Sequence, residues 1–265
     1  MCYSCTEKDK HADIEITSEG RKLTFLRLDS AVFKGDYSNT IDFQNKIKAQ
    51  FGSMYCKYVE NILGLGYCDS LATISNLRTF SSNQDFIQLN NEIDRFYNSQ
   101  RIDSLQEELL FLVLRMEKLI SNYRAPKFIL MNSGFNVSAV SDKEYVAVGL
   151  EFFLGSENQF TKSVALPQYQ KDDMHIRQLV PTVAKSMAYF RLNELDTNSQ
   201  DIDFLSTMIY HGKAYYLAKL AIGEIEDGTL MAWSADQVEW MDNYALNCWK
   251  EVANQEVMFS KNKIE

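Results

Sequence analysis

The sequence has few residues that interrupt helices, since only 3 prolines and 11 glycines occur among 265 residues. It contains no apolar run near the ~18 residues that a membrane-spanning helix needs. Positive charge is also not in excess, because the formal net charge is -9 at pH 7. That charge repels phosphates, and no Lys/Arg cluster with interleaved aromatics occurs, so nucleic-acid binding is set aside. The chain is 46% hydrophobic, which is enough to bury a sizeable core without the help of disulfides or bound metals.

Motifs of the common catalytic centres are missing as well. Zinc peptidases use two histidines one helical turn apart beside a glutamate, but the histidines here are His11, His175 and His211. Neither a Gly-x-Ser-x-Gly elbow nor a phosphate-binding glycine loop occurs. These absences predict a protein that is not an enzyme and has no cofactor and no metal. The alternative is a divergent metal-dependent, peptidase-like hydrolase in which His175 and His211 share an ion with Glu151 or an aspartate at 172 or 173.

Helical periodicity dominates the chain. Apolar spacing predicts a strand at 22–28 and helices at about 41–63, 83–98, 104–120, 176–190, 204–220 and 234–252. Capping-box patterns begin two of these helices, at Ser104 and Ser234. Residues 127–154 form the clearest β-region, interpreted as a hairpin with its turn at Ser141-Asp-Lys143. The sequence predicts a mainly helical α+β fold with a small antiparallel sheet, as a single domain from 21 to 265 after a flexible tail, 1–20.

Glu151 lies in an almost continuously apolar part of this hairpin. On a strand it would share a face with Gly149 and Phe153 and would either point to solvent or line a groove. The exposed face is the favoured interpretation. Even in a groove, nothing beside Glu151 supplies a nucleophile, a base or a metal ligand. A groove would present Glu151 and Phe153 to a partner, and an exposed strand there could pair with an extended peptide.

A second candidate region is the predicted helix around Gly212. Glycine inside a helix costs about 1 kcal/mol relative to alanine, so we expect a packing reason, namely close approach of another helix. In the predicted last helix, the residues expected to face inward are Val238, Met241, Ala245, Cys248, Trp249 and Val252. The side chains that could reach the wall of a binding cleft from the Gly212 region are Tyr210, His211, Lys213 and Tyr215.

The cysteines suggest two covalent features. A small residue precedes Cys5 and a polar stretch follows it, which is compatible with the remnant of a bacterial lipoprotein signal, in which Cys5 would carry the lipid. The alternative is an ordinary disordered terminus. Cys56 and Cys68 lie on either side of a predicted helix end, where they would form a disulfide in an oxidising compartment or stay as buried thiols.

Five segments occur in an order that resembles the GldB gliding-motility lipoprotein family, and the resemblance extends over roughly residues 22 to 260. It implies a lipid-anchored envelope protein, which favours Cys5 as the lipid attachment site and places Cys2 in the discarded signal. The segments are Ser133-Gly-Phe-Asn136, Val148-Gly-Leu-Glu-Phe-Phe-Leu-Gly155, Leu166-Pro-Gln-Tyr169, Met208-Ile-Tyr-His-Gly-Lys213 and Ser234-Ala-Asp-Gln-Val-Glu-Trp240.

The resemblance also implies a role and a shape. The role is that of a periplasmic lipoprotein in the cell envelope, held at a membrane by its anchor and binding a protein or envelope partner of the gliding or secretion machinery. The implied shape is a degenerate zincin-like fold with a metal-type helix near 174–192 and a supporting helix near 203–220. His211 would stand about where such peptidases have a glutamate, so the resemblance implies the fold without the activity.

Overall fold

The computed structural model describes residues 18, 20–195, 203–255 and 257–259, and Cys2 and Cys5 lie outside them. The fold is 66% helical with a small sheet, which confirms the predicted mainly helical α+β class. Within the described chain the sheet has four strands in the order β1-β2-β4-β3. These strands are β1 (Phe25–Arg27), β2 (Lys127–Met131), β3 (Ala139–Ser141) and β4 (Tyr145–Gly149).

The sheet is mixed, so the predicted antiparallel sheet is wrong in part. β3 and β4 form an antiparallel hairpin, and its turn follows Ser141 as expected. However, β1 pairs with β2 and β2 pairs with β4 in parallel. β2 and β4 are apolar on both faces, because helices cover both sides of the sheet, and this is the usual situation of parallel strands.

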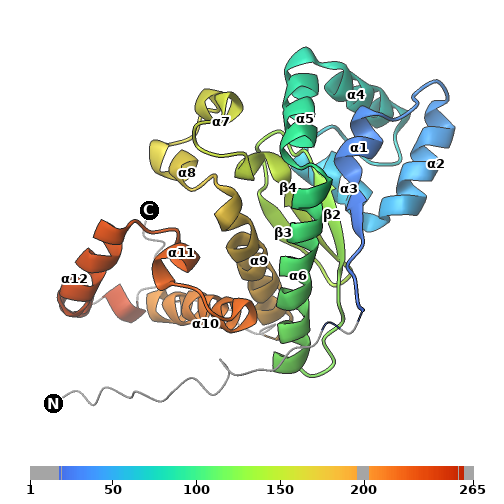
Figure 1. Cartoon of the computed structure of the whole chain (residues 1–265). Helices are drawn as coiled ribbons and strands as arrows, with labels where there is room; N and C mark the ends of the chain where they lie inside the picture. Colours follow the sequence, from blue (N-terminus) through green and yellow to red (C-terminus); the bar gives the residue numbers. More distant parts are fainter. Residues whose placement is uncertain (1–17, 19, 196–202, 256, 260–265) are drawn as a thin grey trace.

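Two hydrophobic cores lie on opposite faces of the sheet. Phe128, Leu130, Val146 and Val148 belong to one core, whereas the alternate strand residues belong to the other. The first core is covered by α5 (Gln84–Phe96), α6 (Ser99–Leu119), α9 (Leu179–Leu195) and α10 (Phe204–Ile222). Of these, α6 lies in front of the strands and α9 beside them (Figure 1). The second is covered by α1 (Leu28–Phe33), α2 (Thr40–Phe51), α3 (Ser53–Lys57), the π-helix η1 (Tyr58–Ile62) and α4 (Leu71–Ser82).

The structure divides one predicted helix and moves the start of another. The helix expected at 41–63 is divided, because Gly52 takes a left-handed φ of 57° between α2 and α3. The helix expected to begin at Ser104 begins at Ser99, where the Asn98 side chain accepts a hydrogen bond from the Arg101 backbone N–H. Ser104 instead bonds to Glu108 inside α6. The capping box at Ser234 is confirmed.

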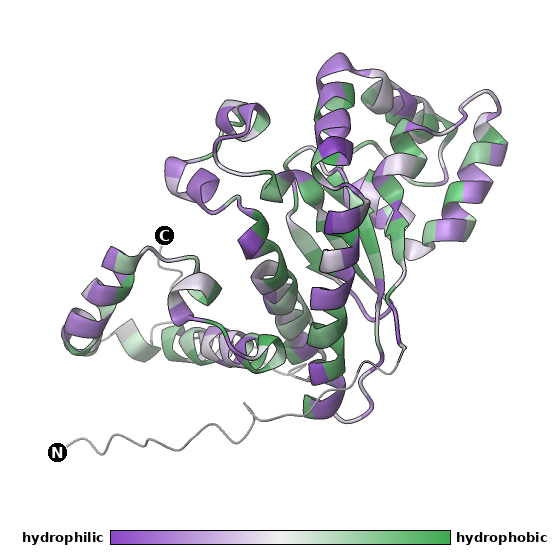
Figure 2. Ribbon diagram, in the orientation of Figure 1, coloured by the Kyte–Doolittle hydropathy of each residue, from purple (hydrophilic) through white to green (hydrophobic). Residues whose placement is uncertain are grey.

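The C-terminal part of the chain lies to one side of the sheet (Figure 1). It contains α11 (Asp227–Met231), α12 (Ala235–Asn254) and the 3-10 helix η4 (Val257–Phe259). Hydrophobic colour runs along the strands and much of α10, whereas α12 is mixed (Figure 2). The remaining short elements, between β4 and α9, are η2 (Leu150–Phe153), α7 (Gln159–Ser163), α8 (Gln168–Asp172) and η3 (Ile176–Gln178).

Candidate functional site

Glu151 is fully buried, so the prediction of an exposed or groove-lining acid is wrong. β4 ends at Gly149, and Glu151 lies in the 3-10 helix that follows, where the alternation of a strand no longer applies. One carboxylate oxygen, Oε1, accepts hydrogen bonds from the backbone N–H groups of Ser133 (2.8 Å) and Phe135 (3.0 Å). The Ser133 hydroxyl is also within hydrogen-bond distance of it. Glu151 therefore connects the ends of β2 and β4.

The turn held by Glu151 contains two residues with left-handed backbone, Gly134 (φ 65°) and Phe135 (φ 63°). A side chain larger than hydrogen at φ above zero is strained, and the bond from the Phe135 N–H to the carboxylate compensates in part. Ser133 Oγ also accepts from the backbone N–H of Val137 at 3.1 Å. Gly149 packs so close to this turn that an added Cβ would overlap the carbonyl oxygen of Val137. The acid thus stabilises a tight turn.

Burial raises the pKa of Glu151 to about 7, although its hydrogen bonds with Ser133 and Phe135 lower it. Its second oxygen, Oε2, and Asn132 Nδ2 are buried and have no hydrogen-bond partner among the described residues. A carboxyl with this pKa holds a proton for part of the time at neutral pH. Proton transfer to a substrate is not supported by the geometry, because the side chain has no exposed surface.

Buried polar residues follow each of the three parallel strands. Asp29 comes two residues after β1, Asn132 and Ser133 follow β2, and Glu151 follows β4, and all four are 0% exposed. The carboxyl ends of parallel strands are a frequent ligand site in α/β proteins. Here aromatic hydroxyls occupy this edge, donating to the carbonyl oxygens of Asn132 (from Tyr58, 2.7 Å) and Leu150 (from Tyr97, 3.2 Å).

The predicted residues from the α10 region form a separate cluster with Tyr189 of α9. Tyr189 Oη lies 2.7 Å from His211 Nδ1, and Tyr210 Oη donates to Asn193 Oδ1 at 2.6 Å. The ring of Tyr215 also contacts Tyr189, at 6.5 Å between centroids. Lys213 is exposed on the same helix. Phe153 is buried in the core, so the structure does not bring the Gly149–Phe153 segment and the α10 residues into one groove.

Gly212 does not mark a close helix approach, so that expectation is wrong. The residue is exposed, and a Cβ added to it would meet nothing within 4 Å. Its φ is not in the left-handed region either. Its exposed neighbours on α10 include Met208, Ile209 and Tyr216.

The alternative metal site is not assembled. His175 Nε2 lies near Ser156 Oγ (3.3 Å), His211 contacts Tyr189, and Glu151 is held in its buried turn. Among the described residues, the three-residue group whose ligand atoms lie within 4.8 Å of one another is a different one. That group consists of Cys56, Glu60 and Cys68. The hydrolase built on His175, His211 and Glu151 is therefore not supported.

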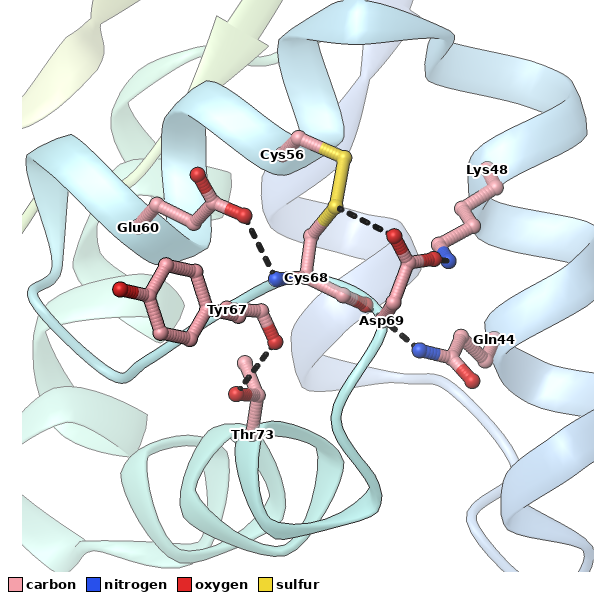
Figure 3. Close-up of a disulfide and its surroundings, with 8 residues drawn as sticks. All are labelled: Gln44, Lys48, Cys56, Glu60, Tyr67, Cys68, Asp69 and Thr73. Carbon is pink, nitrogen blue, oxygen red and sulfur yellow. Dashed lines mark hydrogen bonds and ion pairs between the residues drawn. A yellow bond between two sulfur atoms is a disulfide. The ribbon is translucent and has the colours of Figure 1, made fainter.

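Cys56 and Cys68 form a disulfide, which decides between the two states considered above (Figure 3). The end of the loop at Tyr67 and Cys68 is hydrogen-bonded to the helices on both sides. Glu60 of η1 accepts from the Cys68 N–H at 2.7 Å, and Gln44 of α2 donates to the Cys68 carbonyl at 2.6 Å. Thr73 of α4 donates to the carbonyl of Tyr67 at 2.7 Å. Because both sulfurs are in the bridge, this group is a structural staple in the oxidised protein.

The apolar side chains of helix α12 are only partly packed. None of its residues is buried, and the predicted inward position Trp249 is exposed. Trp240 (52% exposed) and Tyr244 (47% exposed) stack at 5.5 Å between ring centroids. We call Trp240 and Tyr244 the α12 aromatic surface. The exposed Leu246 and Trp249 lie on the opposite side of the helix, because an α-helix has about 3.6 residues per turn. Sequence periodicity missed it, because residues on both flanks of the inward stripe are apolar too.

The sequence model of a protein family described as gliding motility protein GldB matches residues 7–265 of the chain. The chain belongs to the GldB family. This confirms the resemblance found in the sequence and makes the protein a relative of a gliding-motility lipoprotein. No curated protein and no solved structure matches the chain, so the zincin-like shape stays a prediction. Among the described helices of this GldB relative, none is long and apolar enough to cross a membrane.

Proposed function

We propose that this GldB-family protein is a lipid-anchored accessory protein of the cell envelope that binds a protein of the gliding or secretion machinery. The observation that carries the proposal is the α12 aromatic surface, a set of exposed aromatic side chains on a helix with no buried residue. Tryptophan and tyrosine are enriched among the residues that dominate protein interfaces. α12 would supply such a contact, while the sheet supplies the stable body.

A protein partner agrees better with this surface than a lipid surface does. Asp236, Glu239 and Asp242 lie on the same helix and are exposed. Anionic lipid headgroups would repel them, because membrane-surface attraction depends on clustered Lys and Arg. Contact with the membrane is instead assigned to the anchor at Cys5, which lies outside the described residues.

The Cys56–Cys68 bridge supports an envelope location. Disulfides form and persist in oxidising compartments such as the bacterial periplasm and are rare in the cytosol. A periplasmic domain tethered through one lipid-bearing cysteine would keep this bridge and would hold the α12 aromatic surface near the membrane.

The α12 contact can be tested by complementing a deletion strain of the source bacterium with the full-length precursor. Trp240→Ala with Tyr244→Ala should reduce spreading or secretion, while the protein remains folded and at the wild-type level in the membrane fraction. The matched control is Phe111→Ala, because Phe111 is also a half-exposed aromatic residue (49%), on α6. Full activity of the double variant, or equal loss in the control, would rule out a specific role for this surface.

The anchor has its own test in the same strain. Cys5→Ala in the precursor should move the protein from the membrane fraction to the soluble fraction, because the thiol that carries the lipid is gone. Unchanged fractionation would contradict the anchor, and it would leave the α12 contact to be judged by its own variants.

A further inference from the structure

A cleft of about 1430 Å³ lies between α8 and η3 on one side and α11 and the first half of α12 on the other. In Figure 1, α8 lies above α11 and α12. The two walls are joined by a hydrogen bond, because Gln178 of η3 donates to the Thr229 carbonyl of α11 at 3.0 Å. The volume exceeds the range of small-ligand pockets, about 300–1,000 Å³, so the cleft suits a larger, extended ligand.

The lining of this cleft is strongly acidic. Six carboxylates line it among the described residues, against one cation, Arg177. Asp227 is ion-paired with Lys219 at 2.7 Å. Asp172 accepts a hydrogen bond from Gln168 at 2.8 Å. The others, which form no ion pair within the described chain, are Asp173, Glu226, Glu239 and Asp242. Negative charge concentrated in a cleft raises the local concentration of cationic ligands.

Two further features of the cleft favour a basic side chain as its ligand. Tyr169 and Trp233 lie on opposite walls and are 65% and 36% exposed, and the face of an aromatic ring attracts an ammonium or guanidinium group. Gln178, which also lines the cleft, is only 5% exposed. Its Nε2 is bonded to the Thr229 carbonyl, but its Oε1 accepts no hydrogen bond within the described chain. Because a buried acceptor without a partner is costly, an N–H group of a ligand would stabilise this oxygen.

The spacing of the carboxylates favours a basic segment over a bound metal ion. A calcium ion needs six to eight oxygen ligands at about 2.3–2.6 Å. Among the described residues, no three carboxylates of the cleft bring their oxygens within 4.8 Å of one another. Alternate side chains of an extended peptide are about 7 Å apart on one face, so several basic side chains of one segment can reach separate carboxylates.

We propose that this cleft binds an extended segment of a partner protein that carries two or more Lys or Arg side chains. The basic groups lie among the unpaired carboxylates, with one of them against the Trp233 ring, and an N–H group of the segment donates to Gln178 Oε1. Neither Trp240 nor Tyr244 lines the cleft. The inference therefore goes beyond the proposed function, because it assigns a second surface and the charge of the segment that binds there.

The probe is a set of fluorescein-labelled heptapeptides, Gly-X-Ser-X-Ser-X-Gly, in which X is Lys, Gln or Glu. Fluorescence anisotropy with the full chain should show the Lys peptide binding about tenfold more tightly than the Gln peptide, and the Glu peptide binding least. Added salt should reduce this difference, because it screens the charge pairs. Absent binding of the Lys peptide, or equal affinity for the Lys and Gln peptides, would overturn the proposal.

Variants that neutralise carboxylates locate the effect. Glu226→Gln with Asp242→Asn should weaken binding of the Lys peptide about tenfold, because two unpaired carboxylates of the cleft lose their charge. The matched control is Asp103→Asn with Glu107→Gln, which changes the net charge equally at exposed positions of α6. An equal loss in the control would mean attraction to the overall negative charge of the chain and would overturn the site.

Two tryptophans separate this result from the proposed function. Trp233→Ala should weaken binding of the Lys peptide about threefold, because one cation–π contact is removed. Trp240→Ala should leave the affinity for the Lys peptide unchanged, even if it reduces spreading or secretion. An equal loss in both variants would place the peptide outside the cleft and would overturn the proposal. Full activity of the Trp240 variant in cells would count against the α12 aromatic surface and would leave the peptide affinities as the test of the cleft.

Discussion

The carboxyl ends of the parallel strands and helix α12 differ in how their notable side chains are packed. At the strand ends, Asn132, Ser133 and Glu151 have no exposed surface. The Glu151 carboxylate accepts hydrogen bonds from backbone N–H groups of a turn. On α12 no residue is buried, and Trp240 and Tyr244 project to solvent. The first region contains the residue types associated with catalysis and uses them for stability. The second contains residue types associated with a core and leaves them available for contact.

Substitution of Gly149 should have the largest effect on the packed side of this comparison. Gly149→Ala places a methyl group against the Val137 backbone carbonyl, and backbone cannot move aside as the end of a side chain can. Overpacking of this kind lowers the free energy of unfolding by about 3 kcal/mol. Urea denaturation followed by circular dichroism would measure it. A decrease in the free energy of unfolding below about 0.5 kcal/mol would show that the turn can shift to accommodate the methyl group.

Removal of the disulfide, which lies among the N-terminal helices, should lower the free energy of unfolding by a similar amount. Cys56→Ser with Cys68→Ser opens a loop whose closure stabilises the fold by about 3 kcal/mol in the chain-entropy model. The comparison is with Cys248→Ser, which changes the free, half-buried cysteine of α12 and should cost much less. Thermal unfolding of both proteins under non-reducing conditions would show the difference. Equal midpoints would mean that the bridge adds no stability.

The buried acid should make stability depend on pH. The pKa of Glu151 is about 7 in the folded protein and near 4.5 when unfolded, so its contribution is fully present below about pH 4.5. It is lost as pH rises through about 7, which lowers the free energy of unfolding by about 3 kcal/mol. Glu151→Gln should remove this decline, whereas Glu107→Gln on the exposed face of α6 should retain it. Parallel curves of unfolding free energy for Glu151→Gln and wild type from pH 5 to 8 would contradict the assignment.

Substitution of Gly212 should have the smallest effect on the free energy of unfolding, and it should stabilise the fold. Because a Cβ at this position meets open space, Gly212→Ala should raise the free energy of unfolding by up to about 1 kcal/mol through helix propensity. Chemical denaturation beside Gly149→Ala would test the two glycines as a pair. If Gly212→Ala stabilises the fold and yet reduces spreading or secretion, the exposed glycine belongs to a contact surface. A destabilised variant would mean that Gly212 has a packing role.

Periodicity predicted the elements whose burial is one-sided. The capping box at Ser234, the turn after Ser141 and most helices were readable, because each depends on a local pattern. Parallel pairing of β1 with β2 was not readable, since those strands are about a hundred residues apart and share no local signal. The break in the predicted 41–63 helix was signalled only by Gly52, whose left-handed φ is one of several conformations open to glycine.

Glu151 shows why the candidate site was harder to predict. Its sequence neighbours are apolar both in a strand and in a 3-10 helix, and the direction of its side chain depends on where β4 ends. The partners that make its burial possible are backbone N–H groups of Ser133 and Phe135, which no residue type reveals.

The position of the disulfide has a consequence for the order in which the chain can fold. Its two cysteines are 12 residues apart, so they can meet while most of the chain after Cys68 is still unfolded. β1, in contrast, must wait for β2, about a hundred residues later in the chain. Local contacts form before distant strand pairings because their loops are short. The bridge can therefore fix one helical layer in advance, as a template on which the later strands assemble.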